Sequence, residues 1–302
     1  MKAAQFSRFG GPEALEIVDL PDPHPGPGQI RIVVRAAGVN ATDCKLRAGL
    51  LDFGAGLPQT TGRDVAGVVD AVGEGVTDVA VGDRVFGVSD DGAGAAELAL
   101  LTHRAAIPPS LGFVDAAALP VALETATRSL DQLGVGRGTR LFVNGAAGGI
   151  GAAAVQLALA RGARVIGAAS AANADYLRLL GAEPVTYGAG MAERVRALAP
   201  DGVDVALDVA GSGVLPELID LAGGAHNVVT LADFDGAKRH KVRFSSGAQG
   251  HAFHALAEIG ALIAAGRFWL PVERTYPLAE ISEAHRASER GGVRGRLALV
   301  VG

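Results

Sequence analysis

The 302-residue chain is poor in cysteine, in aromatic side chains and in long uncharged apolar runs. Cys44 is its only cysteine, so no disulfide within the chain is possible and a reducing cytoplasm is the expected location. Acidic residues interrupt the amino-terminal segment too early for a secretion signal. Residues 141–160 carry no charge, but Asn144, Gln156 and several glycines argue against a membrane span. We therefore expect a protein without a membrane partner.

An excess of positive charge is also missing. The formal net charge is −5 and the sequence pI is about 5.8, which argues against general binding to nucleic acid or anionic lipid. The basic run at residues 238–243 is explained better by a solvated loop or a subunit contact. Apolar residues make up 49% of the chain, and its length exceeds one average domain, so we expect two domains with a large core.

A glycine-rich turn is the strongest positive signal. Residues 141–143 are apolar and read as a buried strand, and Gly145, Gly148 and Gly151 follow as G-x-x-G-x-x-G before an alanine-rich helical stretch. Glycine lets a pyrophosphate approach bare backbone and lets the helix approach the strand, and the first N–H groups of the helix then face the phosphates. The order of strand, glycines and helix predicts a dinucleotide site, because a turn without a ligand needs fewer glycines.

The next strand, expected at residues 164–168, indicates which dinucleotide is bound. NAD sites usually end this strand with a carboxylate that binds the ribose 2′-hydroxyl. Here no carboxylate occurs before Asp175, and Ser170 and Asn173 offer hydrogen bonds to a 2′-phosphate. No Arg or Lys lies at this tip, so a positive partner is missing or comes from elsewhere. We predict NADPH as the cofactor.

The distribution of turns and hydrophobic runs predicts two kinds of architecture. Short alternating runs separated by Gly and Pro fill the first 110 residues, which is typical of an all-β barrel. A helix is expected at 115–133 with a break at Pro120. From Thr139 strands and helices alternate, as in a parallel doubly wound α/β sheet. A helix is expected from His254 to Ala265, and the carboxyl-terminal segment is expected to return to the first domain.

Several segments together resemble the medium-chain dehydrogenase/reductase superfamily, and within it the zinc-free quinone oxidoreductase (zeta-crystallin-like) branch. Residues 146–151 with Gln156 resemble the signature A-A-G-G-x-G-x4-Q, and residues 38–49 resemble G-V-N-x-x-D-x-K-x-R-x-G. Residues 62–69 and 81–85 are similar to G-x-D-x-x-G-x-V and V-G-D-R-V. The resemblance covers nearly the whole chain and implies a GroES-like β-barrel catalytic domain (residues 1–122 and 268–302) plus a Rossmann cofactor domain (residues 123–267).

The resemblance and the strand pattern together give a set of candidate cofactor contacts. Thr125 resembles a family residue near the nicotinamide phosphate, and Tyr187 aligns with a tyrosine that borders the 2′-phosphate. Gly211 and Ala232 lie at strand ends, where a doubly wound sheet opens its crevice. Phe244 is a candidate for the substrate pocket, although burial alone also explains it. The remaining candidates belong to the glycine turn and are Gly145, Ala147, Gly148, Gly149, Ile150 and Gly151.

The chain departs from the zinc-dependent members of the superfamily. These have a cysteine ligand where Asn40 stands and a His-Glu pair where Arg63 and Asp64 stand, and Asn and Arg do not fill those positions. His251 and His254 are spaced to share a helix face, but with no third ligand nearby they are read as surface histidines. We expect no catalytic metal.

Without a metal, oxidation of a plain alcohol lacks the group that stabilises the alkoxide. A quinone or an α,β-unsaturated carbonyl spreads the hydride's charge onto a distant oxygen, so one or two hydrogen-bond donors suffice. Asn40 and Lys45 are the hypothetical donors, while capping of the backbone by Asn40 and solvent exposure of Lys45 are the competing explanations.

The sequence therefore predicts an NADPH-dependent reductase of a small-molecule quinone or enone, with the proton supplied by solvent. Three alternatives stay open: an enoyl-thioester reductase, a tailoring enzyme of a biosynthetic pathway, and a redox-inactive NADPH-binding sensor. A homodimer is expected from the resemblance, and no nucleic-acid partner is expected.

Overall fold

The computed structural model describes residues 1–52 and 54–302, and the chain divides into two compact units. Unit 1 comprises Met1–Val121, Leu256–Ala264 and Leu270–Gly302, and unit 2 comprises Ala122–Ala255 and Ala265–Trp269. Helix α9 (Ala255–Ala264), expected in the cofactor domain, belongs to unit 1 except for its first residue. The domain boundaries given above stay a prediction.

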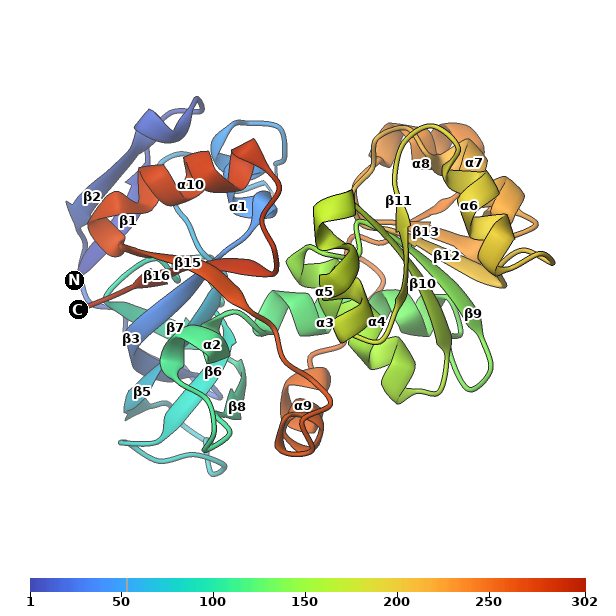
Figure 1. Cartoon of the computed structure of the whole chain (residues 1–302). Coiled ribbons are helices and arrows are strands. Elements are labelled where there is room, and N and C mark those ends of the chain that lie inside the picture. The colour runs from blue at the N-terminus through green and yellow to red at the C-terminus, as the bar shows by residue number, and fades with distance from the viewer. Residues whose placement is uncertain (53) are drawn as a thin grey trace. The chain divides into compact units, whose positions relative to one another are not determined.

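Unit 1 is built on a seven-stranded, mainly antiparallel sheet with the order β15-β16-β3-β5-β6-β8, in which β7 also pairs with β3 (Figure 1). Buried and half-buried residues alternate at the start of β3, because successive side chains point to opposite faces of a strand. Ile30, Ile32 and Val34 thereby enter the core. The strands are β3 (Ile30–Val39), β5 (Asp64–Val72), β6 (Arg84–Val88), β7 (Leu98–Leu101), β8 (His103–Ala106), β15 (Val272–Pro277) and β16 (Arg296–Val300).

A second, three-stranded sheet of order β2-β1-β4 completes the β structure of unit 1. Its strands are β1 (Lys2–Phe6), β2 (Leu15–Asp19) and β4 (Gln59–Thr60). The β-rich architecture predicted for this region is confirmed, although the first 110 residues also contain a helix at Ala41–Arg47. The strands β1, β4, β8 and β15 were not predicted from the sequence.

Short helices connect the strands of unit 1. Helix α1 (Ala41–Arg47) follows β3 directly, and α2 (Phe113–Ala117) precedes α3 (Pro120–Gln132). The predicted helix at 115–133 is thus two helices, and the break falls at Pro120, which opens α3 where its missing N–H leaves no carbonyl unsatisfied. Near the carboxyl terminus, η4 (Leu278–Glu280) leads into α10 (Ile281–Arg290), which contacts α1 and β15. The one-turn helix η1 is Pro12–Ala14.

Unit 2 is a six-stranded sheet in which every pair is parallel, with the order β11-β10-β9-β12-β13-β14. Numbered within the unit this order is 3-2-1-4-5-6, the doubly wound arrangement that binds dinucleotides. The predicted parallel α/β sheet is therefore confirmed. The strands are β9 (Arg140–Asn144), β10 (Arg164–Ala169), β11 (Glu183–Thr186), β12 (Val205–Asp208), β13 (Val228–Thr230) and β14 (Arg243–Phe244).

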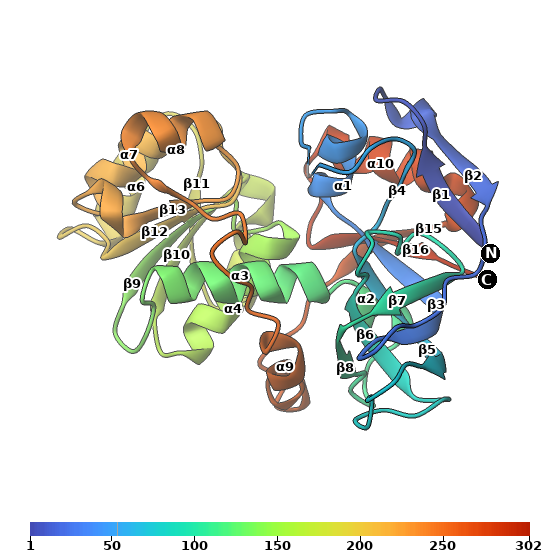
Figure 2. The ribbon, with the colours of Figure 1, turned by 180° about the vertical axis from the view of Figure 1, so that it is seen from behind.

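Helices cover both faces of the parallel sheet (Figures 1 and 2). Helices α4 (Gly149–Ala160) and α5 (Ala174–Leu179) lie on one face, and α6 (Met191–Leu198), α7 (Leu215–Leu221) and α8 (Phe234–His240) lie on the other. This distribution follows from right-handed crossovers that run outward in one direction from β9 and then in the other. The crevice therefore opens at the carboxyl ends of β9 and β12, where the strand order reverses. The short helices η2 (Ala171–Asn173) and η3 (Ala225–Asn227) complete the unit.

Candidate active site

The glycine turn links the end of β9 to the start of α4. Gly145 has φ +84°, a conformation that favours glycine, and a Cβ on it would lie 2.9 Å from the Cβ of Ala210. A Cβ on Gly151 would lie 2.1 Å from the carbonyl oxygen of Gly145, so this glycine allows the helix to approach the turn. Gly148 precedes the helix, and the only atom near its hypothetical Cβ is 3.8 Å away. Bare backbone therefore faces open space beside Gly148.

The first N–H groups of α4 have no partner within the helix, and the helix dipole adds positive potential there. Together with the open backbone at Gly148, they form a cradle for the pyrophosphate of a dinucleotide. The predicted residues Ala147, Gly149 and Ile150 belong to the same turn and first helical turn. The residues present thus fit a dinucleotide cofactor.

A buried carboxylate joins the ends of three neighbouring strands. Asp208, the last residue of β12, accepts hydrogen bonds from Asn144 Nδ2 at 2.8 Å, Thr230 Oγ1 at 2.7 Å and the Gly211 N–H at 2.8 Å. Burial raises the pKa of Asp208, and these hydrogen bonds act in the opposite direction. Asn144 is the last residue of β9 and Thr230 is the last residue of β13. The network therefore holds the carboxyl ends of β9, β12 and β13 together at the crevice.

The same network positions Gly211 and Ala232. A Cβ on Gly211 would lie 3.3 Å from the Cβ of Ala232, so the loops after β12 and β13 lie side by side. Thr230 Oγ1 also accepts a hydrogen bond from the Ala232 N–H at 3.2 Å. Sequence reasoning named Gly211 and Ala232 but missed Asn144, Asp208 and Thr230. The available signal was a polar residue at the end of each apolar strand.

The three residues predicted near the 2′-phosphate lie at the ends of adjacent strands. Ser170 follows β10, and Asn173 Nδ2 donates to its hydroxyl oxygen at 3.2 Å. Tyr187 follows β11, and its N–H donates to the Ala169 carbonyl at 3.2 Å, while its side chain is exposed. Because Ala169 pairs with Thr186, the structure brings Ser170, Asn173 and Tyr187 to one corner of the sheet.

Sequence reasoning found no cation at this corner, and the structure supplies one. The guanidinium of Arg194, on α6, donates to the Thr186 carbonyl at 2.7 and 3.1 Å, to that of Ala189 at 3.0 Å and to that of Gly188 at 3.3 Å. These bonds hold the positive charge at the end of β11, beside Tyr187. This cation comes from α6, the helix that follows β11.

Thr125 and Phe244 lie elsewhere in unit 2. Thr125 on α3 is buried, and its hydroxyl donates to Glu124 at 3.1 Å. Phe244 ends β14, contacts the ring of Phe234 edge-on with centroids 5.3 Å apart, and packs against the core of the unit. Packing in the core of the unit therefore explains a phenylalanine at position 244, at least for the part of the ring that is buried.

In unit 1, Asn40 and Lys45 have different environments. Asn40, just before α1, is 4% exposed, and its Nδ2 donates to Asp64 Oδ2 at 3.1 Å. Asp64 also accepts from the Val121 N–H at 2.7 Å and from Arg296 Nη2. Burial raises the pKa of Asp64 and outweighs the opposing charge of Arg296. Lys45 lies on α1 with an exposed side chain.

The residues around Asp64 do not fit a zinc ion. Zinc sites use Cys, His or carboxylate ligands, and here an amide and a guanidinium contact the Asp64 carboxylate. Among residues 1–52 and 54–302 there is no cluster of three His, Cys, Asp or Glu side chains that could hold a metal. His251 and His254 share no helix, because both precede α9.

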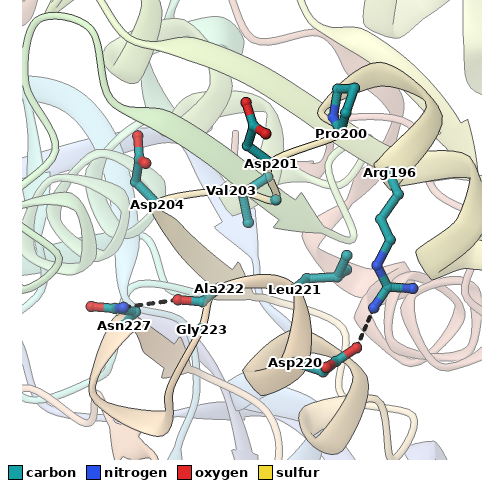
Figure 3. A pocket seen from close by; sticks show the side chains of 11 residues that line it. Arg196, Pro200, Asp201, Val203, Asp204, Asp220, Leu221, Ala222, Gly223 and Asn227 are labelled. Atoms are coloured by element: carbon teal, nitrogen blue, oxygen red, sulfur yellow. Dashed lines mark hydrogen bonds and ion pairs between the residues drawn. The ribbon is translucent and has the colours of Figure 1, made fainter.

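A separate hollow in unit 2 lies at the amino ends of β12 and β13 (Figure 3). Val203 and Asp204 on its wall precede β12, and Asn227, whose Nδ2 donates to the Ala222 carbonyl at 2.8 Å, precedes β13. Arg196 and Asp220 form an ion pair at its rim (Figure 3). Because doubly wound sheets bind ligands at the carboxyl ends of their strands, this hollow is not the cofactor crevice.

No helix in the described ranges is long and apolar enough to cross a membrane.

The sheet order and the glycine turn define a nucleotide-binding dehydrogenase fold. Residues 26–108 match the family model of the alcohol dehydrogenase GroES-like domain, and residues 180–299 match that of the zinc-binding dehydrogenase. The quinone oxidoreductase of Rattus norvegicus is 34% identical over 239 residues, which cover 76% of this chain and 73% of that protein. The chain belongs to the medium-chain dehydrogenase/reductase superfamily, in its quinone oxidoreductase branch.

Two further similarities bear on cofactor and substrate. A mycobacterial protein whose structure was solved with NADPH has a TM-score of 0.85 and 28% identity, over 99% of this chain and all of that one. The spectinabilin polyketide synthase system protein NorB of Streptomyces orinoci is 32% identical over 97% of this chain, which spans only 14% of that much longer protein. The chain is an oxidoreductase whose fold binds a nicotinamide cofactor.

Proposed function

We propose that the chain is an NADPH-dependent reductase of quinones or α,β-unsaturated carbonyls that works without zinc. The observation that carries the proposal is the set of side chains that donate hydrogen bonds to Asp64. An amide and a guanidinium stand there in place of metal ligands, while the glycine turn keeps the geometry of a dinucleotide site. The similarity to quinone oxidoreductases supports the same substrate class.

The preference for NADPH over NADH rests on the corner formed by the ends of β10 and β11. No carboxylate lies between the end of β10 and Asp175 to repel a 2′-phosphate, and Ser170 and Asn173 supply hydrogen-bonding groups. Arg194 adds the positive charge, and guanidinium groups bind phosphate well. The similarity to a protein that binds NADPH supports this choice.

Bound NADPH supplies the hydride, and the chain binds and orients the reactants. The backbone at Gly148 and the N-terminus of α4 hold the pyrophosphate, and the Asp208 network keeps the loops after β12 and β13 in one arrangement. Asn40 and Lys45 are the proposed donors to the acceptor carbonyl. One preorganised donor to a developing oxyanion lowers the reaction barrier by roughly 3–4 kcal/mol. The cytoplasmic location, the homodimer and the absence of nucleic-acid and membrane partners stay predictions.

Turnover of the purified chain tests this proposal. We expect NADPH oxidation with an ortho-quinone and with a vinyl ketone, no dehydrogenation of a plain alcohol, and the same rate after dialysis against a metal chelator. In the same assay, Asn40→Ala is expected to lower turnover at least threefold. A rate that falls with the chelator and returns with zinc would contradict the metal-free proposal, and nucleotide binding without turnover would indicate a sensor.

An enoyl-thioester reductase is the second candidate, because a segment of a polyketide synthase system protein is similar to 97% of this chain. A thioester-linked enone uses the same hydride chemistry, so the two candidates differ in how the substrate's carrier is bound. A crotonyl thioester belongs in the assay beside the quinone. If its kcat/KM exceeds that of both the quinone and the vinyl ketone, the second candidate is the better one.

A further inference from the structure

The segment that follows β14 lies at the half of the crevice expected to hold the nicotinamide. Doubly wound sheets consist of two mononucleotide-binding halves. Here β9, β10 and β11 form the half with the glycine turn and the 2′-phosphate corner, so β12, β13 and β14 form the nicotinamide half. The chain leaves β14 at Phe244 and runs through residues 245–254 before α9 begins.

A buried carboxylate on α3 holds this segment. Glu124 accepts hydrogen bonds from Arg128 Nε at 2.7 Å, from the Ala252 N–H at 3.3 Å and from His251 Nδ1 at 3.1 Å. Arg128 also donates to the hydroxyl of Ser245. Burial alone would raise the pKa of Glu124, but the hydrogen bonds and charge of Arg128 outweigh it and lower the pKa. Glu124 is therefore an anion already neutralised by one buried cation.

His251 is the exposed member of this group. Its side chain is 47% exposed, whereas that of Glu124 is 6% exposed. The imidazole stacks on Phe253 with centroids 4.8 Å apart, and a Cβ on Gly247 would lie 2.4 Å from its Cε1. The ring is thus held between an aromatic face and bare backbone. Its Nδ1 is directed to Glu124, and this hydrogen bond leaves Nε2 as the second titratable nitrogen.

Charge compensation of Glu124 does not require this histidine, because Arg128 already provides it. What the contact provides is control of the imidazole: a carboxylate on Nδ1 fixes the tautomer and the orientation of the ring. Two charged groups face His251 from α3, Glu124 directly and Arg128 behind it. An oriented, half-exposed imidazole beside a buried carboxylate is the arrangement of a general acid.

We propose that His251 is the catalytic residue that protonates the reduced substrate, with Glu124 as its positioning residue. This inference rests on the proposed function. The hydride that the cofactor gives up forms a C–H bond at the β-carbon of an enone or at a ring carbon of a quinone, and the conjugated carbonyl becomes an enolate. The N–H bond at Nε2 of protonated His251 then breaks as the proton passes to that anion. Neutral imidazole remains and takes up a proton from water.

His251→Gln tests the proposal, with His254→Gln as the matched control, because His254 is also exposed and lies three residues further on. We expect His251→Gln to lower kcat about 10²-fold, with NADPH affinity and KM changed less than twofold. The pH profile of kcat is expected to differ between the variant and the wild type, because the variant lacks the group proposed to transfer the proton. Added imidazole is expected to restore part of the rate.

A second measurement needs neither cofactor nor substrate. Long-range ¹H–¹⁵N spectra of the protein without nucleotide report which ring nitrogen of His251 carries the proton, and we expect Nδ1. A kcat within threefold of wild type together with an unchanged pH profile would overturn the proposal, as would a proton on Nε2 alone in the neutral ring. If the wild-type protein reduces no acceptor, the proposed function has failed, and the tautomer still reports on the pairing with Glu124.

Discussion

At the scale of single residues, several buried carboxylates are charged only at an energetic cost. Asp43, in the first turn of α1, is 2% exposed and accepts the Asn40 N–H at 2.9 Å. Burial raises its pKa to about 6, and the negative charge of Asp64 adds to the shift. The folded protein therefore binds a proton at Asp43 between pH 4 and 6 that the unfolded chain has released, and this proton stabilises the fold only at low pH.

The unfolding free energy of the wild type should consequently contain an Asp43 contribution that is lost as the pH rises from about 4 to about 6. We expect Asp43→Asn to remove it, so that the unfolding free energy at pH 4.5 relative to that at pH 7, measured with urea, is about 2 kcal/mol lower in the variant than in the wild type. His285 titrates with the opposite sign, because burial lowers its pKa to about 4, and it is common to both proteins. Equal pH dependence in the two proteins would contradict the role assigned to Asp43.

At the scale of an element, the turn before α4 uses its glycines for different purposes. Gly151 allows close packing, since a Cβ there would overlap the Gly145 carbonyl, whereas Gly148 borders open space. In the sequence pattern G-x-x-G-x-x-G the two glycines are not distinguished from each other. Only the packed structure separates the one that the fold needs from the one that the ligand needs.

Alanine substitutions should therefore separate folding from binding. We expect Gly148→Ala to change the unfolding free energy by less than about 0.5 kcal/mol and to weaken NADPH binding at least tenfold, because its methyl group occupies pyrophosphate space. Gly151→Ala should cost more than about 2 kcal/mol of stability. Urea unfolding and fluorescence titration with NADPH measure the two effects. If Gly148→Ala binds NADPH normally, the pyrophosphate does not lie at this backbone.

At the scale of the whole molecule, cofactor binding is linked to unfolding. A nucleotide that binds only the folded chain adds about 2.7 kcal/mol at one hundred times its Kd, and a tenfold weaker one adds about 1.4 kcal/mol at the same concentration. We expect the unfolding free energies measured by chemical denaturation with NADPH and with NADH to differ by at least the gap between these two values, about 1.3 kcal/mol. Arg194→Gln should narrow the gap, because it removes the cation at the end of β11. Equal stabilisation of the wild type by both nucleotides would contradict the predicted preference.

Much of this protein was determined by local sequence. The glycine turn, the alternating strands of unit 1 and the break at Pro120 depend on backbone sterics and side-chain periodicity within a few residues, so the pattern alone predicted them. The absence of metal-ligand types at Asn40 and Arg63 is equally visible in the printed chain. The short strands β1, β8 and β15 lack a strong period and form because neighbouring strands pair with them.

Only the tertiary structure decided which distant polar groups meet. Asp64 and Arg296 are 232 residues apart, and Glu124 and His251 are 127 residues apart, and each pair lies in a different part of the fold. Arg194 brings a positive charge to the end of β11 from α6, the helix that follows that strand. Such meetings depend on the order of strands in a sheet and on the packing of helices against it. A one-dimensional spacing carries no record of either, so the contact between His251 and Glu124 could not be predicted from the sequence.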